Sequence, residues 1–368
     1  MCKKCFILIL TILCILPMSY SIIAKASSDY SDGDIGEIYT ITLEDGSFLF
    51  EKSGVEVGDI YINSDFEEYI VMSIDSNFKT GIAKFNRQIV PPKVDFNYTP
   101  TPIQTMKKTI CMYSTHNDES YITGDGVDSV YGAGGIHDVA NELKNEFLKS
   151  GINTVYDETL HIPHDTSAYS RSKYTASKLM DEYSPNAIFD IHRDGASRST
   201  YVSKYNGKDV CKIRMVVGKS NNNYAINQEF AVYLMSVAKE LHPWLFLDIY
   251  FGKGHYNQSL SNKAILFEMG SHLVEKELVL KSVEPLAEVI NVALFGTTIN
   301  EEGDAIIGGN TAVNPTIDEY FDNENLAKVV TANSTKPWVI GIIVTMIVSI
   351  TITTIVSLSS FNMRRKRK

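Results

Sequence analysis

Cysteine is scarce in this chain. Five occur in 368 residues, and three of them lie within the first 14 positions. Only Cys111 and Cys211 remain in the body of the chain, both in apolar contexts typical of strands. At most one disulfide can therefore form there, and two buried free thiols are equally consistent with the sequence. Cys14 follows Leu13 instead of a small residue, which argues against a lipoprotein signal.

Basic residues are few in the body of the chain. The whole sequence has 34 Lys and Arg against 44 Asp and Glu, a net charge of −10. Nine of the cations lie near the two ends, so the part between them carries 25 basic and 44 acidic residues, a net charge of −19. This balance argues against nucleic acid as a partner, because phosphates bind basic surfaces. It fits a protein that acts in a neutral or cationic polymer matrix.

Charge is absent from an apolar segment near the N-terminus. Two lysines precede an uncharged run from Phe6 to Leu16, which is too short to span a bilayer comfortably. Small residues at positions 24 and 26 then form a cleavage pattern. We therefore predict a secretory signal peptide over 1–26. The alternative is an uncleaved anchor, because apolar residues resume shortly before the cleavage pattern.

A second uncharged segment lies near the C-terminus. It runs from Trp338 to Leu358, 21 residues that can cross a bilayer at about 1.5 Å per residue. A basic cluster follows within 359–368, and such clusters stay on the cytoplasmic side. The sequence therefore predicts a single-pass membrane protein with a transmembrane helix over 338–358, a cytoplasmic C-terminus and an extracytoplasmic body.

The body divides into a β-rich part and a part in which strands and helices alternate. Residues 27–90 show alternating apolar patterns and an Asp-Gly turn, which indicate a small β-rich domain. Its predicted role is in positioning or binding, and the alternative is a structural spacer. Prolines over 91–105 mark a linker. Residues 106–297 alternate between strands and helices, which predicts an α/β domain. The polar, acidic residues 298–336 are predicted to form a flexible stalk to the membrane.

Polar residues follow three predicted strands of the α/β domain. His116 and Glu119 follow the first, His192 ends the second, and Glu268 ends the third. The carboxyl ends of neighbouring strands in an open α/β sheet converge on one crevice. Two histidines and one or two carboxylates there have the composition of a catalytic zinc site with an open coordination position. The sequence therefore predicts a zinc hydrolase.

The individual residues leave alternatives open. His116 is either a ligand or an ordinary loop histidine, and Glu119 three residues on favours the first. Glu268 is a proton-transferring carboxylate, the third ligand, or a solvated group at a strand end. Arg193 and Asp194 either orient ligands beside His192 or form a structural ion pair.

Further histidines are candidates of lower rank. His137 begins a predicted helix and is the alternative to Glu119 as a ligand. His161 and His164 share a loop and either line the cleft or hold structure. The histidines nearer the C-terminal end of the domain are interpreted as packing or substrate-side residues.

Several stretches, in this order, resemble the stage II sporulation protein P family, bacterial cell-wall hydrolases related to zinc-dependent N-acetylmuramoyl-L-alanine amidases. Together they span nearly all of 106–297, and the combination is much more specific than any one motif. The matching stretches are THNDESY (115–121), YGAGGIHDVANEL (131–143), HIPHDTSAYSRSKYTAS (161–177), IFDIHRDG (188–195), MVVGKSNNNYAIN (215–227) and YNQSLSNKAILFEMGSH (256–272).

The resemblance implies a zinc amidase-like fold, a mixed sheet with helices on both faces, and a bound Zn²⁺. It implies hydrolysis of the amide between N-acetylmuramic acid and the L-alanine of the stem peptide of peptidoglycan. It also implies a setting: septal wall remodelling and engulfment in a sporulating cell, beside a partner enzyme that cleaves glycan. Cleavage of peptide cross-links is a second activity associated with the family.

The resemblance also implies roles for residues. His116 and His192 take ligand roles, Glu268 is the catalytic carboxylate, and Glu119 is the chosen third ligand with His137 as its alternative. Arg193 is assigned to stabilising the developing oxyanion. This sequence departs from the family pattern at Ser114, where relatives carry another histidine.

Two rival functions remain. One is a zinc endopeptidase that cuts only peptide cross-links in the wall. The other is a wall-binding scaffold that keeps the cleft without turnover, since the histidine missing at Ser114 leaves one ligand position uncertain.

Overall fold

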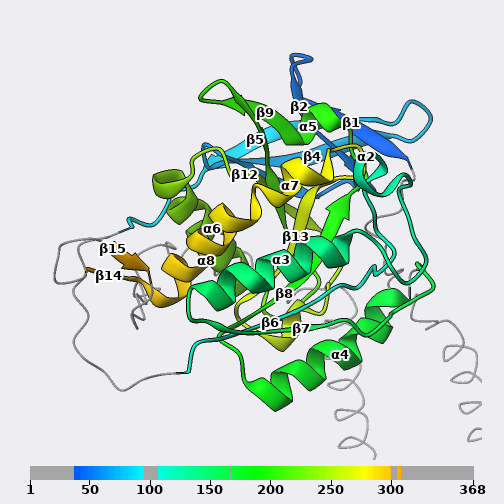
Figure 1. Ribbon diagram of the computed structural model, residues 1–368. Helices are drawn as coiled ribbons and strands as arrows, with labels where there is room; N and C mark the ends of the chain where they lie inside the picture. The colour runs from blue at the N-terminus through cyan, green and yellow to red at the C-terminus, as the bar shows by residue number, and fades with distance from the viewer. Residues whose placement is uncertain (1–36, 95–106, 166, 300–304, 308–368) are drawn as a thin grey trace, which may run out of the picture. The chain divides into compact units, whose positions relative to one another are not determined.

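The computed structural model describes residues 37–94, 107–165, 167–299 and 305–307. These residues belong to one compact unit, shown in Figure 1. The predicted signal peptide, transmembrane helix and basic tail lie outside the described residues, as does most of the predicted stalk. Among the described helices, none has the length and apolar character needed to cross a membrane.

An 11-stranded mixed sheet forms the centre of the unit, in the order β2-β1-β5-β4-β3-β12-β11-β13-β8-β6-β7. Its first five strands along the chain are β1 (Ile38–Thr42), β2 (Phe48–Ser53), β3 (Ile60–Asn63), β4 (Glu67–Asp75) and β5 (Thr80–Gln88). The others are β6 (Thr109–Tyr113), β7 (Asn153–Asp157), β8 (Ala187–Asp194), β11 (Ile213–Gly218), β12 (Phe246–Gly252) and β13 (Ala264–Ser271).

The directions of the strands confirm the predicted mixed α/β sheet. Strands β7, β6, β8 and β13 are parallel neighbours, so their carboxyl ends share one edge. β13 is antiparallel to β11, which is parallel to β12. No strand was predicted from the sequence at β12, although its residues are mostly apolar. β8 continues two residues beyond His192 and β13 three residues beyond Glu268, so these residues lie within strands and not at their ends.

Helices cover both faces of the sheet, as predicted. α3 (Ile136–Lys149), α6 (Tyr224–Leu241) and α8 (Val283–Phe295) pack on one face around the main core. α4 (Ala168–Tyr183) covers the other face beside β6 and lies apart from these helices in Figure 1. The remaining elements are α2 (Ile122–Asp125), α5 (Arg198–Tyr201), β9 (Val202–Tyr205), β10 (Lys208–Cys211), η2 (Gln258–Leu260), α7 (Lys276–Leu280), β14 (Thr297–Ile299) and β15 (Ala305–Ile307).

Strand alternation places the polar residues of the sheet on one face. Side chains two residues apart on a strand share a face, so His192 and Asp194 of β8 lie together and Arg193 points the other way. Glu268 pairs in register with His192 on one side and with Arg214 on the other. The α4 face therefore carries the predicted histidine and carboxylate together.

The β-rich segment continues the sheet of the α/β part. β3 pairs antiparallel with β12, with Ile62 opposite Ile249. Aromatic residues of the segment pack on the α4 face: Phe50 stacks on Tyr61 at 4.6 Å between ring centroids and meets Tyr250 of β12 edge-on. The boundary predicted at 91–105 thus separates strands that share one sheet, and the segment covers the face that carries Glu268.

Candidate metal centre

The structure brings the three predicted ligands together around one carboxylate oxygen. Oε1 of Glu119 lies 3.1 Å from Nδ1 of His116 and 3.4 Å from Nδ1 of His192. All three side chains are buried. In a tetrahedral zinc site with bonds of about 2.0–2.1 Å, neighbouring ligand atoms lie about 3.3–3.4 Å apart. The two distances at Oε1 of Glu119 lie close to that value, but among the described residues the group whose ligand atoms all lie within 4.8 Å of one another is His116, Glu119 and His164.

Glu119 is held in place by elements on two sides. Its other oxygen, Oε2, accepts a hydrogen bond of 2.9 Å from the backbone N–H of Arg193. Its backbone carbonyl accepts one of 3.0 Å from the N–H of Ile136 at the start of α3. The loop after β6 is thus tied to β8 and to α3, which fixes the carboxylate between the two histidines.

His192 contacts a second carboxylate with its other ring nitrogen. Nε2 lies 3.0 Å from Oδ1 of Asp190, an ion-pair contact whose angles do not make it a hydrogen bond. Asp190 itself accepts hydrogen bonds from the backbone N–H and the hydroxyl of Thr115. A carboxylate behind a histidine in this way is the usual outer shell of a metal ligand, because it fixes the orientation of the ring.

The three side chains around Oε1 of Glu119 differ in protonation state. Burial acts to raise the pKa of Glu119, but His192 and hydrogen bonds from both histidines outweigh it and lower that pKa well below the usual range. Burial lowers the pKa of His116. Burial also acts to lower the pKa of His192, yet Asp190 and Glu119 raise it well above the usual range. Glu119 and His116 are thus in the protonation states that metal binding requires, whereas His192 keeps a proton that a bound metal would have to displace.

His164 is a member of the cluster that the sequence left undecided. Ligand atoms of His116, Glu119 and His164 lie within 4.8 Å of one another. The His164 ring stacks on His116 with centroids 3.8 Å apart, and its Nδ1 lies 2.9 Å from Oδ1 of Asp118. In the described part of the chain, Nε2 of His116 and Nε2 of His164 are buried without a hydrogen-bond partner. These nitrogens, beside an ionised carboxylate, fit a divalent metal such as zinc.

His161, the other histidine of that loop, has a structural role. Its Nδ1 lies 2.8 Å from the carbonyl oxygen of Ser114, and its Nε2 lies 2.8 Å from the hydroxyl of Thr175. The two histidines differ because residues 161 and 164 point to different sides of their loop. The sequence spacing could show that they share a loop but not which of them faces the cluster.

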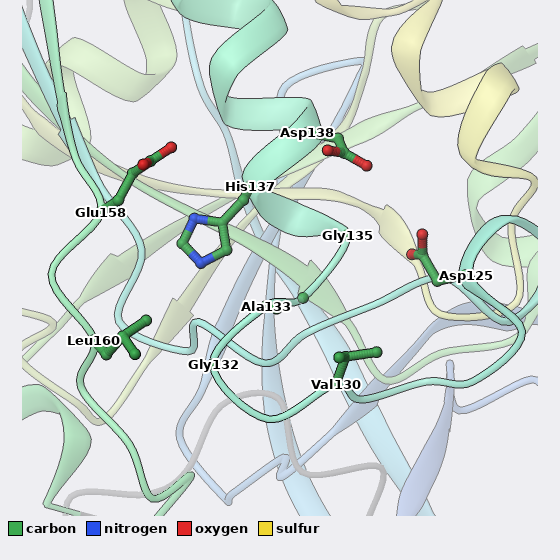
Figure 2. Close-up of a pocket in the computed structure, with 10 residues that line it drawn as sticks. Asp125, Val130, Gly132, Ala133, Gly135, His137, Asp138, Glu158 and Leu160 are labelled. Carbon is green, nitrogen blue, oxygen red and sulfur yellow. The ribbon is translucent and has the colours of Figure 1, made fainter.

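His137, the alternative ligand, faces a different cavity. It lines a cavity of about 550 Å³ with Asp125, Asp138 and Glu158, where Figure 2 shows its ring beside the glycine-rich turn before α3. Its Nδ1 lies 2.8 Å from the hydroxyl of Tyr156. That hydroxyl also bonds to Ser114, at 3.0 Å. The structure therefore places Glu119, and not His137, between His116 and His192.

Glu268 lies among buried charges on the α4 face. It is fully buried and in register with His192. Beside it, the guanidinium of Arg214 binds Asp194 at 2.7 Å and both carboxylate oxygens of Asp248 at 2.7 and 2.9 Å. The sequence signal for this cluster was available, since Arg214 and Asp248 each interrupt an otherwise apolar strand.

Arg193 makes contacts on the side of β8 away from Glu268. Its Nε donates to the carbonyl of Ser120 at 3.3 Å, and its Nη2 donates to the carbonyl of Asp128 at 3.0 Å. These bonds tie down the loop that carries Glu119. The predicted action of Arg193 on an oxyanion stays a prediction.

Aromatic rings cover the histidines. The ring of Tyr169, at the start of α4, lies parallel to His192 with centroids 6.2 Å apart and edge-on to His116 at 5.5 Å. The ring of Tyr256 packs against Tyr169, with the two ring centroids 5.4 Å apart. This cover keeps the cluster away from water, which strengthens electrostatic interactions within it.

Together, the mixed sheet and the buried His–Glu–His cluster beside a further carboxylate define an α/β protein with the site composition of a metallohydrolase. The sequence model described as "Stage II sporulation protein P (SpoIIP)" matches residues 67–291, more than half of the chain. The chain belongs to the SpoIIP family.

Individual proteins resemble the chain more distantly. Stage II sporulation protein P of Bacillus subtilis (strain 168) is 27% identical over 195 residues, which are 45% of this chain and 45% of that protein. The chain thus matches about half the length of this curated relative.

Among solved structures, the CwlD amidase of Clostridioides difficile, in complex with the GerS lipoprotein, is 15% identical with a TM-score of 0.36. The matched region covers 50% of this chain and 95% of the CwlD chain. The amidase AmiC2 of Nostoc punctiforme is 13% identical with a TM-score of 0.34, and the match covers 52% of this chain and 97% of the AmiC2 chain. At these scores the likeness says nothing about the site of this chain.

Proposed function

We propose that this protein is a zinc-dependent peptidoglycan hydrolase that cleaves the amide between N-acetylmuramic acid and L-alanine of the stem peptide. The observation that carries the proposal is the spacing of His116 and His192 around Glu119, with Glu268 in register beside His192. Membership of the SpoIIP family supports a peptidoglycan substrate and a role in sporulation.

In this proposal His116, Glu119 and His192 hold the metal. When zinc is bound, it supplies a water of lowered pKa and a polarised carbonyl group. Glu268 accepts the proton of the attacking water and delivers it to the leaving amine. Asp190 and the backbone N–H of Arg193 keep His192 and Glu119 in the geometry that these steps need.

The proposal includes a location and a partner. The body acts outside the cytoplasm at the septal membrane, anchored by the predicted helix at 338–358, and works beside an enzyme that cleaves the glycan strands. The support for the location is the uncharged segment with its basic tail. The support for the partner is family resemblance.

The test is product analysis on intact peptidoglycan. The full-length chain, purified in a mild detergent, is incubated with peptidoglycan after zinc loading and after removal of metal by a chelator. Glu268→Gln is compared with the matched change Glu240→Gln, which alters an exposed carboxylate on α6. We expect zinc-dependent release of free stem peptides, lost in Glu268→Gln and kept in Glu240→Gln.

Other products decide against the proposal in different ways. Shortened cross-links without free stem peptides would identify an endopeptidase. Zinc binding without release of either product would favour the wall-binding scaffold. Release that continues after complete metal removal would exclude a metal-dependent reaction.

A further inference from the structure

Strand β2 of the β-rich segment contacts the buried charges around Glu268. The backbone carbonyl of Glu51 accepts a hydrogen bond of 3.1 Å from Arg214. The carboxylate of Glu51 accepts bonds from the hydroxyls of Ser197 and Thr200, just after β8. The segment is therefore docked against the site through main-chain and side-chain bonds from one residue of β2.

The next residue on β2, Lys52, places a buried positive charge in the same cluster. Its side chain is 1% exposed, and Nζ lies 3.9 Å from Oδ1 of Asp194 and 5.2 Å from the ring centre of Tyr250. The other oxygen of Asp194 binds Arg214 and the hydroxyl of Tyr201, each at 2.7 Å. A fully buried lysine is costly to a fold unless its charge is paired.

The buried cluster contains more negative than positive groups. Lys52 and Arg214 are its cations, and Asp194, Asp248 and Glu268 are its carboxylates, all buried on one face of the sheet. Two cations thus balance three carboxylates, one of which is the proposed proton carrier. Without Lys52, one of the two cations that face these carboxylates would be lost in a place that water does not reach, and the carboxylates would repel one another more strongly.

We propose that Lys52 is a positioning residue of the active site: the β-rich segment supplies it so that, with Arg214, it holds Asp194 and Glu268 in place. This inference rests on the proposed function. It gives the β-rich segment a part in the reaction, in addition to its place in the sheet. Lys52 acts through the carboxylates and through the strands β8 and β13 that carry them.

Ion pairs elsewhere between the segment and the α/β part provide a comparison. Lys239 of α6 binds Asp65 at 2.8 Å, with side chains that are 43% and 73% exposed. Exposed ion pairs contribute little to stability. Lys239→Met therefore removes a lysine–carboxylate contact between the same two parts without touching the buried cluster.

The experiment compares Lys52→Met, Lys52→Arg and Lys239→Met in the zinc-loaded full-length chain. Metal content, thermal midpoint, kcat and KM for release of stem peptides are measured for each. We expect Lys52→Met to lose kcat on the order of 10²-fold, with KM and metal content little changed, because a carboxylate displaced by about 1 Å costs that much. Lys52→Arg should recover most of the loss, and Lys239→Met should match the wild type.

Two outcomes would overturn the proposal. Lys52→Met could keep its kcat close to wild type while folded and zinc-loaded. Alternatively, Lys52→Arg could fall as far as Lys52→Met, which would mean that the shape of the side chain matters and its charge does not.

A stability comparison tests the charge balance without relying on activity. The thermal midpoint is measured for Lys52→Met in the wild-type and in the Glu268→Gln background. We expect a clearly smaller loss in the second, because the double variant has the same net charge in the cluster as the wild type. Equal losses, or a double variant that fails to fold while Glu268→Gln folds, would contradict the proposal. The wild-type chain could lack hydrolase activity while Lys52→Met still lowers the thermal midpoint less in the Glu268→Gln background. That result would refute the proposed function and leave the positioning role of Lys52 standing.

Discussion

At the scale of single residues, two histidines contact the same oxygen of one buried carboxylate. Glu119 contacts His116 and His192 through the same oxygen and receives the Arg193 N–H on the other. His137, the alternative ligand predicted from the sequence, is hydrogen-bonded to the hydroxyl of Tyr156 instead. Substitutions at 119 and 137 should therefore have different effects on metal binding.

We predict that Glu119→Gln weakens zinc binding by at least about 100-fold, because an anionic ligand is replaced by a neutral amide. His137→Ala should bind zinc within about threefold of the wild type. Competition with a chromophoric chelator measures both affinities. A large loss in His137→Ala with none in Glu119→Gln would reverse the assignment of the ligand.

The two cysteines of the body are free and buried. Burial raises the pKa of the Cys111 thiol to about 12 and also raises that of Cys211. Since the thiolate is the reactive form, we predict that neither is alkylated in the native protein at pH 8 and that both react after unfolding. Peptide mass spectrometry after iodoacetamide treatment checks this. A disulfide-linked peptide pair, or labelling of the native protein, would contradict it.

At the scale of elements, the start of α3 is pressed against the loop that carries Glu119. The N–H of Gly134 donates to the carbonyl of Asn117 at 2.9 Å. A Cβ on Gly134 would lie 2.3 Å from the carbonyl oxygen of Glu119 and 2.5 Å from the carbonyl carbon of Asp118. Both are backbone atoms that cannot move without moving Glu119.

We predict that Gly134→Ala lowers zinc affinity by about 10- to 100-fold, an effect comparable to loss of an outer-shell contact. Ala133→Ser, at the exposed neighbouring position, is the control and should leave the affinity unchanged. Chelator competition on both variants is the measurement. Equal zinc affinity in Gly134→Ala and the wild type would contradict the prediction, because it would show that the loop can accommodate a Cβ at residue 134.

At the scale of the molecule, the β-rich segment and the α/β part share one sheet and one core. Ile62 of β3 is fully buried within the main core and lies opposite Ile249 of β12. Without β3, β12 would become an exposed edge of the sheet. The two parts should therefore unfold together.

We predict that Ile62→Ala destabilises the protein by about 2–5 kcal/mol and lowers the unfolding midpoint of both parts equally. Met72→Ala, at a side chain that is 55% exposed, should change stability by less than about 0.5 kcal/mol. Hydrogen exchange of peptides from β2 and β13 during denaturant unfolding reports the two parts separately. Loss of protection in β2 well before β13 would show that the segment unfolds independently.

The sequence by itself predicted the mixed α/β sheet and the strands that carry the candidate site residues; the roles of these residues stay predictions. The alternation of strands and helices predicted over 106–297 is present, and the predicted strands carrying His192 and Glu268 are β8 and β13. Residue type and period are local properties, so periodicity could identify these elements and the polar residues at their ends. The uncharged segments at the two ends were also predicted from composition, and they lie outside the described residues.

Only the tertiary structure decided which residues meet. It placed Glu119 and not His137 between the two histidines, added His164 to the cluster, and turned Arg193 away from Glu268. It also joined the β-rich segment to the sheet and brought Lys52 to the site. These facts depend on strand order and on the faces of neighbouring strands, which arise from pairing between distant parts of the chain. A single sequence contains no local signal for such pairing.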